Sequence, residues 1–275
     1  MKKYLIAAVL VIVFLSLISC APTLRLLARK ILIDNTHYNV ENFDGYGKDV
    51  FYETLIEEMD KGFHTLHFTS DVGFAPDGYD VFILPAPFNS YLSSERNKIY
   101  NFLDNGGTLV AMGEHGGFTN NVPINSLLTS LGVDIQFMTN TIYDNNNYYD
   151  DIYEPIISEF LDHPTTRYLD SIVLFAACSL DVFGNASVVA ESSTLSTPEL
   201  FESDNSNSAV SSSVDEFLNE PQVTIAVPIV AVDRIGTGKV IAIPDTNLFA
   251  NDVYDGTPNI DVHDNFQFFY NILFW

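Results

Sequence analysis

The sequence has 275 residues, of which 47% are hydrophobic and 13% are aromatic. This length is enough for one large domain or two small ones, and this composition excludes a disordered chain. Its formal net charge of −24 argues against nucleic acid as a partner, because phosphate backbones bind to basic surfaces. The acidity leaves two interpretations, solubility or a preference for cations, divalent metals included.

The first twenty residues are predicted to be a secretory signal peptide. Lys2 and Lys3 precede an apolar run from Tyr4 to Ile18, which is too short for an ordinary transmembrane anchor, and Leu-Ile-Ser-Cys closes it at Cys20. This ending resembles the lipobox of bacterial lipoproteins. The resemblance implies cleavage before Cys20 and a lipid on its thiol, so we expect an extracytoplasmic protein anchored to a bacterial membrane, with residues 21–29 as a tether.

Apolar runs and helical periodicities alternate in the first half of the remaining chain. Runs typical of buried strands occur at 30–34, 63–68, 79–84 and 108–113. Helices are predicted over 51–59, from Ser93 as the cap to the turn at 105–107, and over 124–131 with Gly132 after its last turn. This alternation indicates an α/β fold with a mostly parallel sheet covered on both faces.

The second half predicts shorter strands, an insertion and a closing helix. Two or three short strands are expected over 171–189, and the Ser- and acid-rich stretch 191–220 is expected to be an exposed insertion. Residues 223–232 and 239–245 flank a Gly-Thr-Gly turn and predict a late β-hairpin. The last helix, capped by Asp261 or Asp264, should bury one stripe of apolar side chains, namely Phe266, Phe269, Tyr270 and Leu273. Residues 30–275 are predicted to form a single domain.

The strand predicted at 108–113 runs into Gly113-Glu114-His115-Gly116-Gly117. The spacing G-x-H-x-G has the outline of a nucleophile elbow, with His115 where Ser or Cys would act. A turn of this kind raises a side chain over the carboxyl edge of a sheet, where α/β proteins bind their ligands.

Several segments together resemble the class I glutamine amidotransferase-like superfamily, and most closely its non-amidotransferase branch of DUF4350-type and gliding-motility-type transporter auxiliary domains. The segments are 31–34, 79–85, 105–109, 113–114, 162–166, 236–247 and 264–266. The resemblance implies a flavodoxin-like three-layer α/β/α sandwich. It does not carry over the amidotransferase triad, because His115 replaces the nucleophilic Cys and no His-x-Glu pair follows the late strand.

In a parallel sheet, residues that close several strands share one edge. Six candidate ligand-binding residues are expected there: Asp34, His37, Glu114, His115, Asp245 and Asn247. They could ligate a divalent cation, or Glu114 and His115 could do acid–base catalysis. Alternatively, Asp34 and Asp245 could simply accept hydrogen bonds from loop amides and terminate their strands.

A second group of candidates lies in the acidic loop at 143–154. Oxygen ligands for Ca²⁺ could come from Asp144, Asn146, Asp150 and Asp151, although the loop lacks the EF-hand glycine and glutamate. A recognition surface for a sugar or a protein could be formed by Tyr143, Tyr148, Tyr149 and Tyr153. Cys178 stands in an apolar run and is predicted to be a small buried residue rather than a nucleophile.

The sequence therefore predicts a lipid-anchored, non-catalytic binding or scaffold domain for a protein, small-molecule or glycan partner. The alternative is a metal-assisted hydrolase that uses the cluster around Glu114 and His115.

Overall fold

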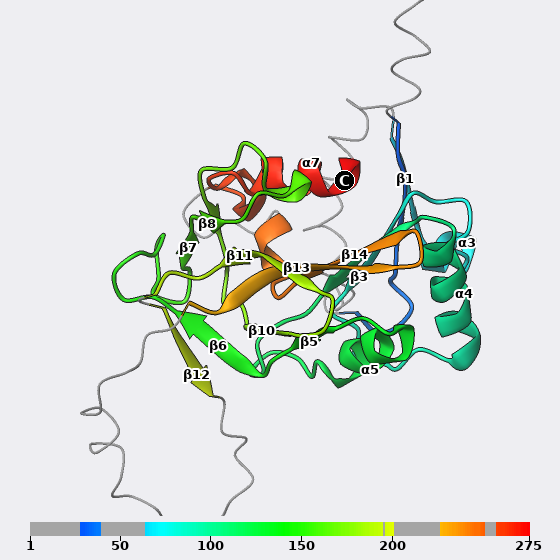
Figure 1. Cartoon of the computed structure of the whole chain (residues 1–275), viewed down its shortest axis with the longest axis horizontal. Helices are drawn as coiled ribbons and strands as arrows, with labels where there is room; N and C mark the ends of the chain where they lie inside the picture. Colours follow the sequence, from blue (N-terminus) through cyan, green and yellow to red (C-terminus); the bar gives the residue numbers. More distant parts are fainter. Residues whose placement is uncertain (1–27, 40–63, 195, 201–225, 251–256) are drawn as a thin grey trace, which may run out of the picture.

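The structure is a computed structural model that describes residues 28–39, 64–194, 196–200, 226–250 and 257–275. Its centre is an eight-stranded sheet with the strand order β2-β1-β3-β4-β14-β13-β11-β8. Figure 1 labels β1, β3, β14, β13, β11 and β8 of this sheet. The strands are β1 (Lys30–Ile33), β2 (Thr65–Phe68), β3 (Val81–Pro85), β4 (Thr108–Met112), β8 (Glu159–Phe160), β11 (Ser187–Glu191), β13 (Pro228–Ile235) and β14 (Gly238–Ile243).

The strands from β2 to β14 pair in parallel, whereas β13, β11 and β8 continue the sheet antiparallel. The parallel part follows the doubly wound order 2-1-3-4-5, with β14 as the fifth strand, which is the flavodoxin-like order. The β13–β14 hairpin supplies that fifth strand. The predicted fold class, a mostly parallel α/β sandwich with a late hairpin, is therefore confirmed.

Alternation along the parallel strands builds two cores, one on each face of the sheet. Ile31 and Ile33 of β1 face a core shared with α7 (Asn265–Phe274), while Leu32 between them faces a core shared with α4 (Ser93–Asp104) and α5 (Val122–Leu131). Both faces are apolar because helices cover both of them. Figure 1 shows α7 and α5 on opposite sides of the sheet.

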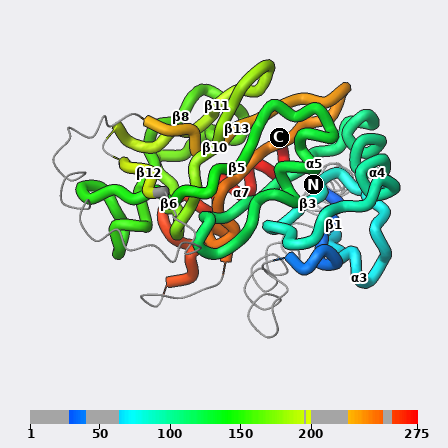
Figure 2. The backbone as a smooth tube through the Cα atoms, turned by 90° about the horizontal axis from the view of Figure 1, so that it is seen from below, coloured from blue at the N-terminus to red at the C-terminus, as the bar shows by residue number. Residues whose placement is uncertain are grey.

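Three small antiparallel pairs extend the molecule beyond the parallel strands. They are β5 (Ile135–Phe137) with β10 (Leu180–Val182), β6 (Asn140–Tyr143) with β12 (Thr197–Leu200), and β7 (Ile156–Ile157) with β9 (Ile172–Val173). In Figure 2 the β6–β12 pair lies at the opposite end of the molecule from α4 and the short helix α3 (Thr69–Val72). Three 3₁₀ turns complete the described elements: η2 (Pro164–Thr166), η3 (Asn247–Phe249) and η4 (Asn259–Asp261).

One local prediction differs from the structure, and others lie partly or wholly outside the described residues. Ser93 is the first residue of α4 and not its cap; the backbone N–H of Leu92 instead donates to the Glu95 carboxylate at 2.7 Å. Within the predicted insertion 191–220, β12 is an ordered strand paired with β6. The predicted helix 51–59 and residues 201–225 lie outside the described residues.

The buried stripe of α7 is also rotated by one residue from the predicted one. Phe269 and Leu273 are buried as predicted, but Phe268 and Ile272 complete the buried stripe in place of Phe266 and Tyr270, and Tyr270 is 44% exposed. The cause is Asn265, whose fully buried amide exchanges hydrogen bonds with the backbone N–H and C=O of Val173 at 3.0 and 3.1 Å and so fixes which side of the helix faces inward. Along the described part of the chain, no helix combines the length and the apolar character needed to span a bilayer.

Candidate functional site: the carboxyl edge of the sheet

The Gly-rich turn after β4 owes its glycines to close packing rather than to unusual backbone angles. A Cβ on Gly113 would lie 2.4 Å from the Phe137 ring, and one on Gly116 would lie 2.3 Å from the carbonyl oxygen of Thr139. Neither distance leaves room for a side chain. The turn is therefore pressed against the β5–β6 segment, and this contact holds Glu114 and His115 in place between the two glycines.

Glu114 points into the protein and is fully buried. Its Oε1 accepts hydrogen bonds from the backbone N–H and the hydroxyl of Thr246, both at 2.7 Å. The Asn121 side chain pairs with the Glu114 backbone, donating to its carbonyl at 2.7 Å and accepting from its N–H at 3.2 Å. The hydrogen bonds between Glu114 and Thr246 connect the turn after β4 to the residues that follow β14.

Asp245 closes β14 and is buried to the same extent. Its two carboxylate oxygens accept from the backbone N–H of Phe175 at 2.6 Å and that of Asn247 at 2.7 Å. Because β4 and β14 are adjacent strands, one strand spacing of about 4.8 Å separates their ends, and Glu114 and Asp245 form a buried carboxyl pair.

Both carboxyls of this pair hold protons more tightly than usual. Burial, the largest cause, and the charge of Glu154 together raise the pKa of Asp245 to about 7. Burial, followed by the charge of Asp245, raises the pKa of Glu114 well above its ordinary value. The pair therefore carries at least one proton near neutral pH, since two adjacent buried carboxylates repel each other.

An open cavity of about 520 Å³ lies over this pair. Its lining residues are His115, Phe118, Asp150, Asp151, Tyr153, Glu154, Phe175, Ala176, Asn247 and Asn259. Asp245 fixes the positions of two of these residues, Phe175 and Asn247, by accepting hydrogen bonds from their backbone N–H groups. Ala176 next to them has a left-handed φ of +64°, a strained conformation that proteins retain at ligand sites more often than elsewhere.

His115 is half-buried in the wall of the cavity and stacks on Phe118, with ring centroids 6.0 Å apart. Burial lowers the pKa of its imidazole, so the ring is neutral at neutral pH. Its Nδ1 lies 3.4 Å from the Thr141 hydroxyl. The side chain thus offers a neutral, polar and aromatic surface to a ligand.

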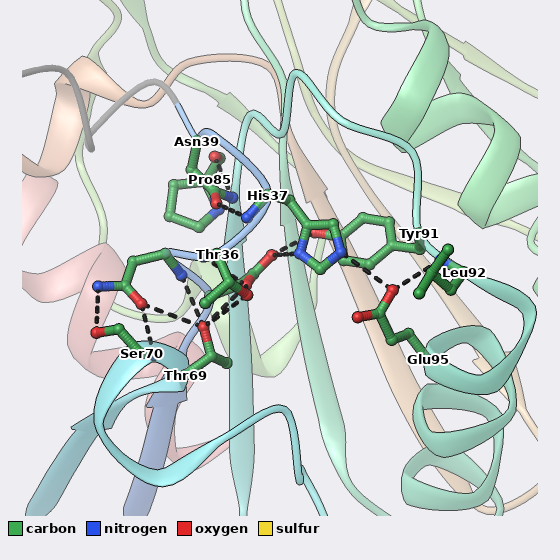
Figure 3. Close-up of polar contacts among 11 residues, drawn as sticks. Thr36, His37, Asn39, Thr69, Ser70, Pro85, Tyr91, Leu92 and Glu95 are labelled. Atoms are coloured by element: carbon green, nitrogen blue, oxygen red, sulfur yellow. Dashed lines mark hydrogen bonds and ion pairs between the residues drawn. The ribbon is translucent and has the colours of Figure 1, made fainter.

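Asp34 and His37 form a separate cluster at the end of β1. Figure 3 shows His37 of this cluster beside Tyr91 and Glu95. Asp34 Oδ2 lies 2.8 Å from His37 Nδ1 and accepts from the Tyr91 hydroxyl at 2.8 Å, while Oδ1 accepts from the hydroxyls of Thr36 and Thr69 at 2.9 and 3.0 Å. The other ring nitrogen of His37 lies 3.2 Å from Glu95 Oε2 at the start of α4. Every strong acceptor position of Asp34 has a protein partner, which favours the interpretation of this residue as a strand terminator.

The structure therefore does not bring the six predicted ligand-binding residues to one crevice. His115 and Asn247 line the cavity, Glu114 and Asp245 are sealed beneath it, and Asp34 and His37 lie elsewhere. The reason is strand order: β3 lies between β1 and β4, so the ends of those two strands are two spacings, about 9.6 Å, apart. Whether any of the six binds a ligand stays a prediction.

The four proposed calcium ligands do not converge either. Asp144 is fully buried, and its oxygens accept from the backbone N–H of Asn146 at 2.8 Å and from the Ser193 hydroxyl at 2.6 Å. Asp150 and Asp151 instead line the cavity. Among the described residues, no group of three or more His, Cys, Asp or Glu side chains is placed to hold a metal ion. Cys178 is fully buried, as predicted, and burial raises the pKa of its thiol.

The sequence did not indicate Glu154, Phe118 or Phe175 as site residues. All three lie outside the helices and strands, in segments without periodicity. The crowding of Asp and Tyr in the loop at 143–154 was the available signal, and Tyr153, one of the four tyrosines proposed for recognition, does line the cavity.

No family model matches the sequence, and no curated protein matches it. Solved structures do match the fold. The N-terminal domain of mmIFT52 is similar with a TM-score of 0.62 and 19% identity, over 89% of this chain and 96% of that one. A cytoplasmic protein from Salmonella typhimurium LT2 is similar with a TM-score of 0.51 and 12% identity, over 89% and 98% of the two chains.

A putative ThuA-like protein from Bacteroides uniformis ATCC 8492 is similar with a TM-score of 0.49 and 16% identity, over 90% of this chain and 89% of that one. At these identities the similarities concern the fold alone, and the amidotransferase-like resemblance stays a prediction. The narrower DUF4350-type branch and the lipoprotein signal stay predictions.

Proposed function

We propose that this chain is a binding module that holds a small organic ligand over the ends of β4 and β14. The observation that carries the proposal is the cavity of about 520 Å³ above the Glu114–Asp245 pair. Its size falls within the range of about 300–1,000 Å³ that small-molecule pockets occupy. Its position at the carboxyl edge of the parallel strands is where α/β folds bind ligands.

The lining of the cavity combines apolar surface with a few fixed polar groups, as binding pockets do. Phe118 and Tyr153 offer aromatic faces that are 52% and 37% exposed. Asn247 and His115 add polar groups whose positions are fixed by the carboxyl pair and the β4 turn. The pocket is therefore shaped before a ligand arrives.

Binding is favoured over hydrolysis by the state of Glu114. Its Oε1 already accepts two hydrogen bonds from Thr246, and the side chain has no exposed surface from which to reach a substrate. The His115 ring stacks on Phe118, and the position of the amidotransferase nucleophile carries no thiol. We further propose that the module acts outside the cytoplasm, tethered by a lipid on Cys20.

Saturation-transfer NMR on the purified full chain tests the proposal, using a set of small cationic, neutral and anionic compounds. We expect saturable signals from at least one compound with the wild type and their loss with Phe118→Ala. Tyr168→Ala is the matched control, because Tyr168 is 90% exposed and does not line the cavity. Signals that persist in Phe118→Ala, or no signal from any compound, would overturn the proposed function.

A further inference from the structure

We infer that the ligand of this pocket is an organic cation, a molecule that carries an ammonium group on an apolar body. The inference rests on the proposed function and names the chemical class that the same pocket selects. Three carboxylates line the cavity, Asp150 and Asp151 at its exposed rim and Glu154 in its wall.

Glu154 is the central residue of this argument because it is only 7% exposed and yet lines the cavity. Its Oε2 accepts hydrogen bonds from the backbone N–H groups of Asp150 at 3.1 Å and Asp151 at 3.3 Å. Both of these hydrogen bonds go to Oε2, and Oε1 is not among the described buried side-chain atoms that lack a partner, so Oε1 faces the cavity rather than a sealed interior. A cationic N–H donor in the cavity would pair with Oε1 in place of water and offset the charge of the carboxylate.

The negative charge around the cavity extends below the lining. The charge of Glu154 acts on Asp245, and that of Asp245 acts on Glu114, so the ionised forms of these three buried carboxyls repel one another. Glu154 itself has a raised pKa, caused first by burial and also by the charges of Asp150 and Asp151. A cation bound in the cavity would stabilise the ionised form of each of these carboxyl groups.

The protein places no opposite charge of its own in the cavity. The described lining contains neither Lys nor Arg, and His115 is its one basic side chain. Because burial lowers the pKa of His115, this ring is uncharged at neutral pH. An anionic ligand would therefore meet repulsion without compensation, and phosphate- or carboxylate-bearing compounds are excluded.

The aromatic side chains decide between an organic cation and a metal ion. Phe118, Tyr153 and Phe175 line the same cavity as the carboxylates, and aromatic faces attract ammonium groups through cation–π interactions. A bare metal ion uses neither aromatic rings nor a cavity of about 520 Å³, and the described residues hold no metal-ligating cluster. Carboxylates beside aromatic rings suit an ammonium group on an apolar or hydroxylated body.

Two matched pairs of probes isolate the charge of the ligand. Choline is compared with its neutral isostere 3,3-dimethyl-1-butanol, and glucosamine with glucose, each titrated into the full chain at pH 7 by saturation-transfer NMR. We expect at least one cation to bind about tenfold more tightly than its neutral partner, which corresponds to one charge interaction in a partly screened site. Added salt should weaken the binding of that cation.

The variants Glu154→Gln and Asp150→Asn should each reduce the affinity for the cation several-fold. Asp162→Asn is the matched control, since it removes one exposed acid that does not line the cavity. Because Asp150 is exposed, we expect Asp150→Asn to fold even if Glu154→Gln does not. Equal binding of cation and neutral partner would overturn the inference and leave the proposed function intact, as would binding by neutral or anionic compounds alone. Absence of binding by every compound in both experiments would overturn both.

Discussion

His37 Nδ1 lies 2.8 Å from Asp34 Oδ2 at the end of β1, in a position where only 8% of the His37 side chain is exposed. Burial opposes the charge on both residues. Their mutual attraction and their hydrogen bonds outweigh it, so the pKa of Asp34 is lowered and that of His37 is raised. Glu95 on the other side of the ring adds to the rise for His37. The pair is therefore an ionic clamp between the loop after β1 and the start of α4.

Replacing His37 with Gln should destabilise the protein by roughly 3 kcal/mol, the usual cost of removing one partner of a buried ion pair. The loss should depend on pH. Because the pKa of His37 is higher in the folded than in the unfolded protein, its stabilisation is fully present below about pH 6.5 and declines as the pH rises through the folded-state value. Urea unfolding of the wild type and of His37→Gln at several pH values measures this difference. A difference that grows from pH 6 to pH 9 would contradict the clamp.

Glu114→Gln should be tolerated far better than Glu114→Ala. Gln keeps a carbonyl oxygen for the Thr246 N–H and hydroxyl, and it resembles the protonated acid that the raised pKa favours. Ala leaves both donors buried without a partner, which costs roughly 2–4 kcal/mol. Urea unfolding at pH 7 distinguishes the two variants, and equal destabilisation would contradict the hydrogen-bonding role.

Asp245 should make stability fall as the pH rises. Its pKa is about 7 in the folded protein against 3.8 in the unfolded chain, so the folded state binds more protons between these values. The stabilisation that the protonated Asp245 provides is complete below about pH 4 and is lost as the pH rises towards 7. Asp245→Asn should flatten this decline. Unfolding free energies at pH 5 and pH 7.5 provide the check, and an unchanged slope in the variant would argue against the burial effect.

Cys20→Ala tests the predicted lipid anchor, whose residues lie outside the described part of the chain. With the thiol absent, we expect an uncleaved precursor or release from the membrane fraction, because the predicted lipid has no attachment point. Fractionation and the apparent mass on a denaturing gel report the two results. Cys178→Ala is the matched control, since that thiol is buried inside the domain. Identical fractionation of wild type and Cys20→Ala would refute the anchor.

The fold could be predicted from the sequence because its signals are local. Apolar runs such as Leu109–Met112 mark strands buried on both faces, and the Gly-Thr-Gly turn after β13 marks the hairpin. The rotation of α7 could not be predicted, because it depends on hydrogen bonds between Asn265 and Val173, which lies 92 residues away.

The site was predicted only in part, for the same physical reason. The sequence indicates which residues end strands, but strand order decides which ends meet. That order joins Glu114 to Asp245 and separates both from Asp34. The partnership of His37 with Glu95 spans 58 residues and leaves no pattern in the sequence.

The turn after β4 gives a last prediction, about why its glycines are required. Gly116→Ala should cost roughly 2–3 kcal/mol, because the added Cβ would lie 2.3 Å from the Thr139 carbonyl oxygen and would push the β4 turn away from β6. Gly132→Ala is the informative comparison: its φ of +80° strains an alanine, but no atom lies within 4 Å of the new Cβ, so the cost should be nearer 1 kcal/mol. Urea unfolding ranks the two variants. Because Gly116 follows His115 directly, Gly116→Ala should also weaken ligand binding in the cavity, whereas Gly132→Ala should not. A Gly116→Ala variant as stable as Gly132→Ala would show that the turn has room to move and that packing does not hold His115 in place.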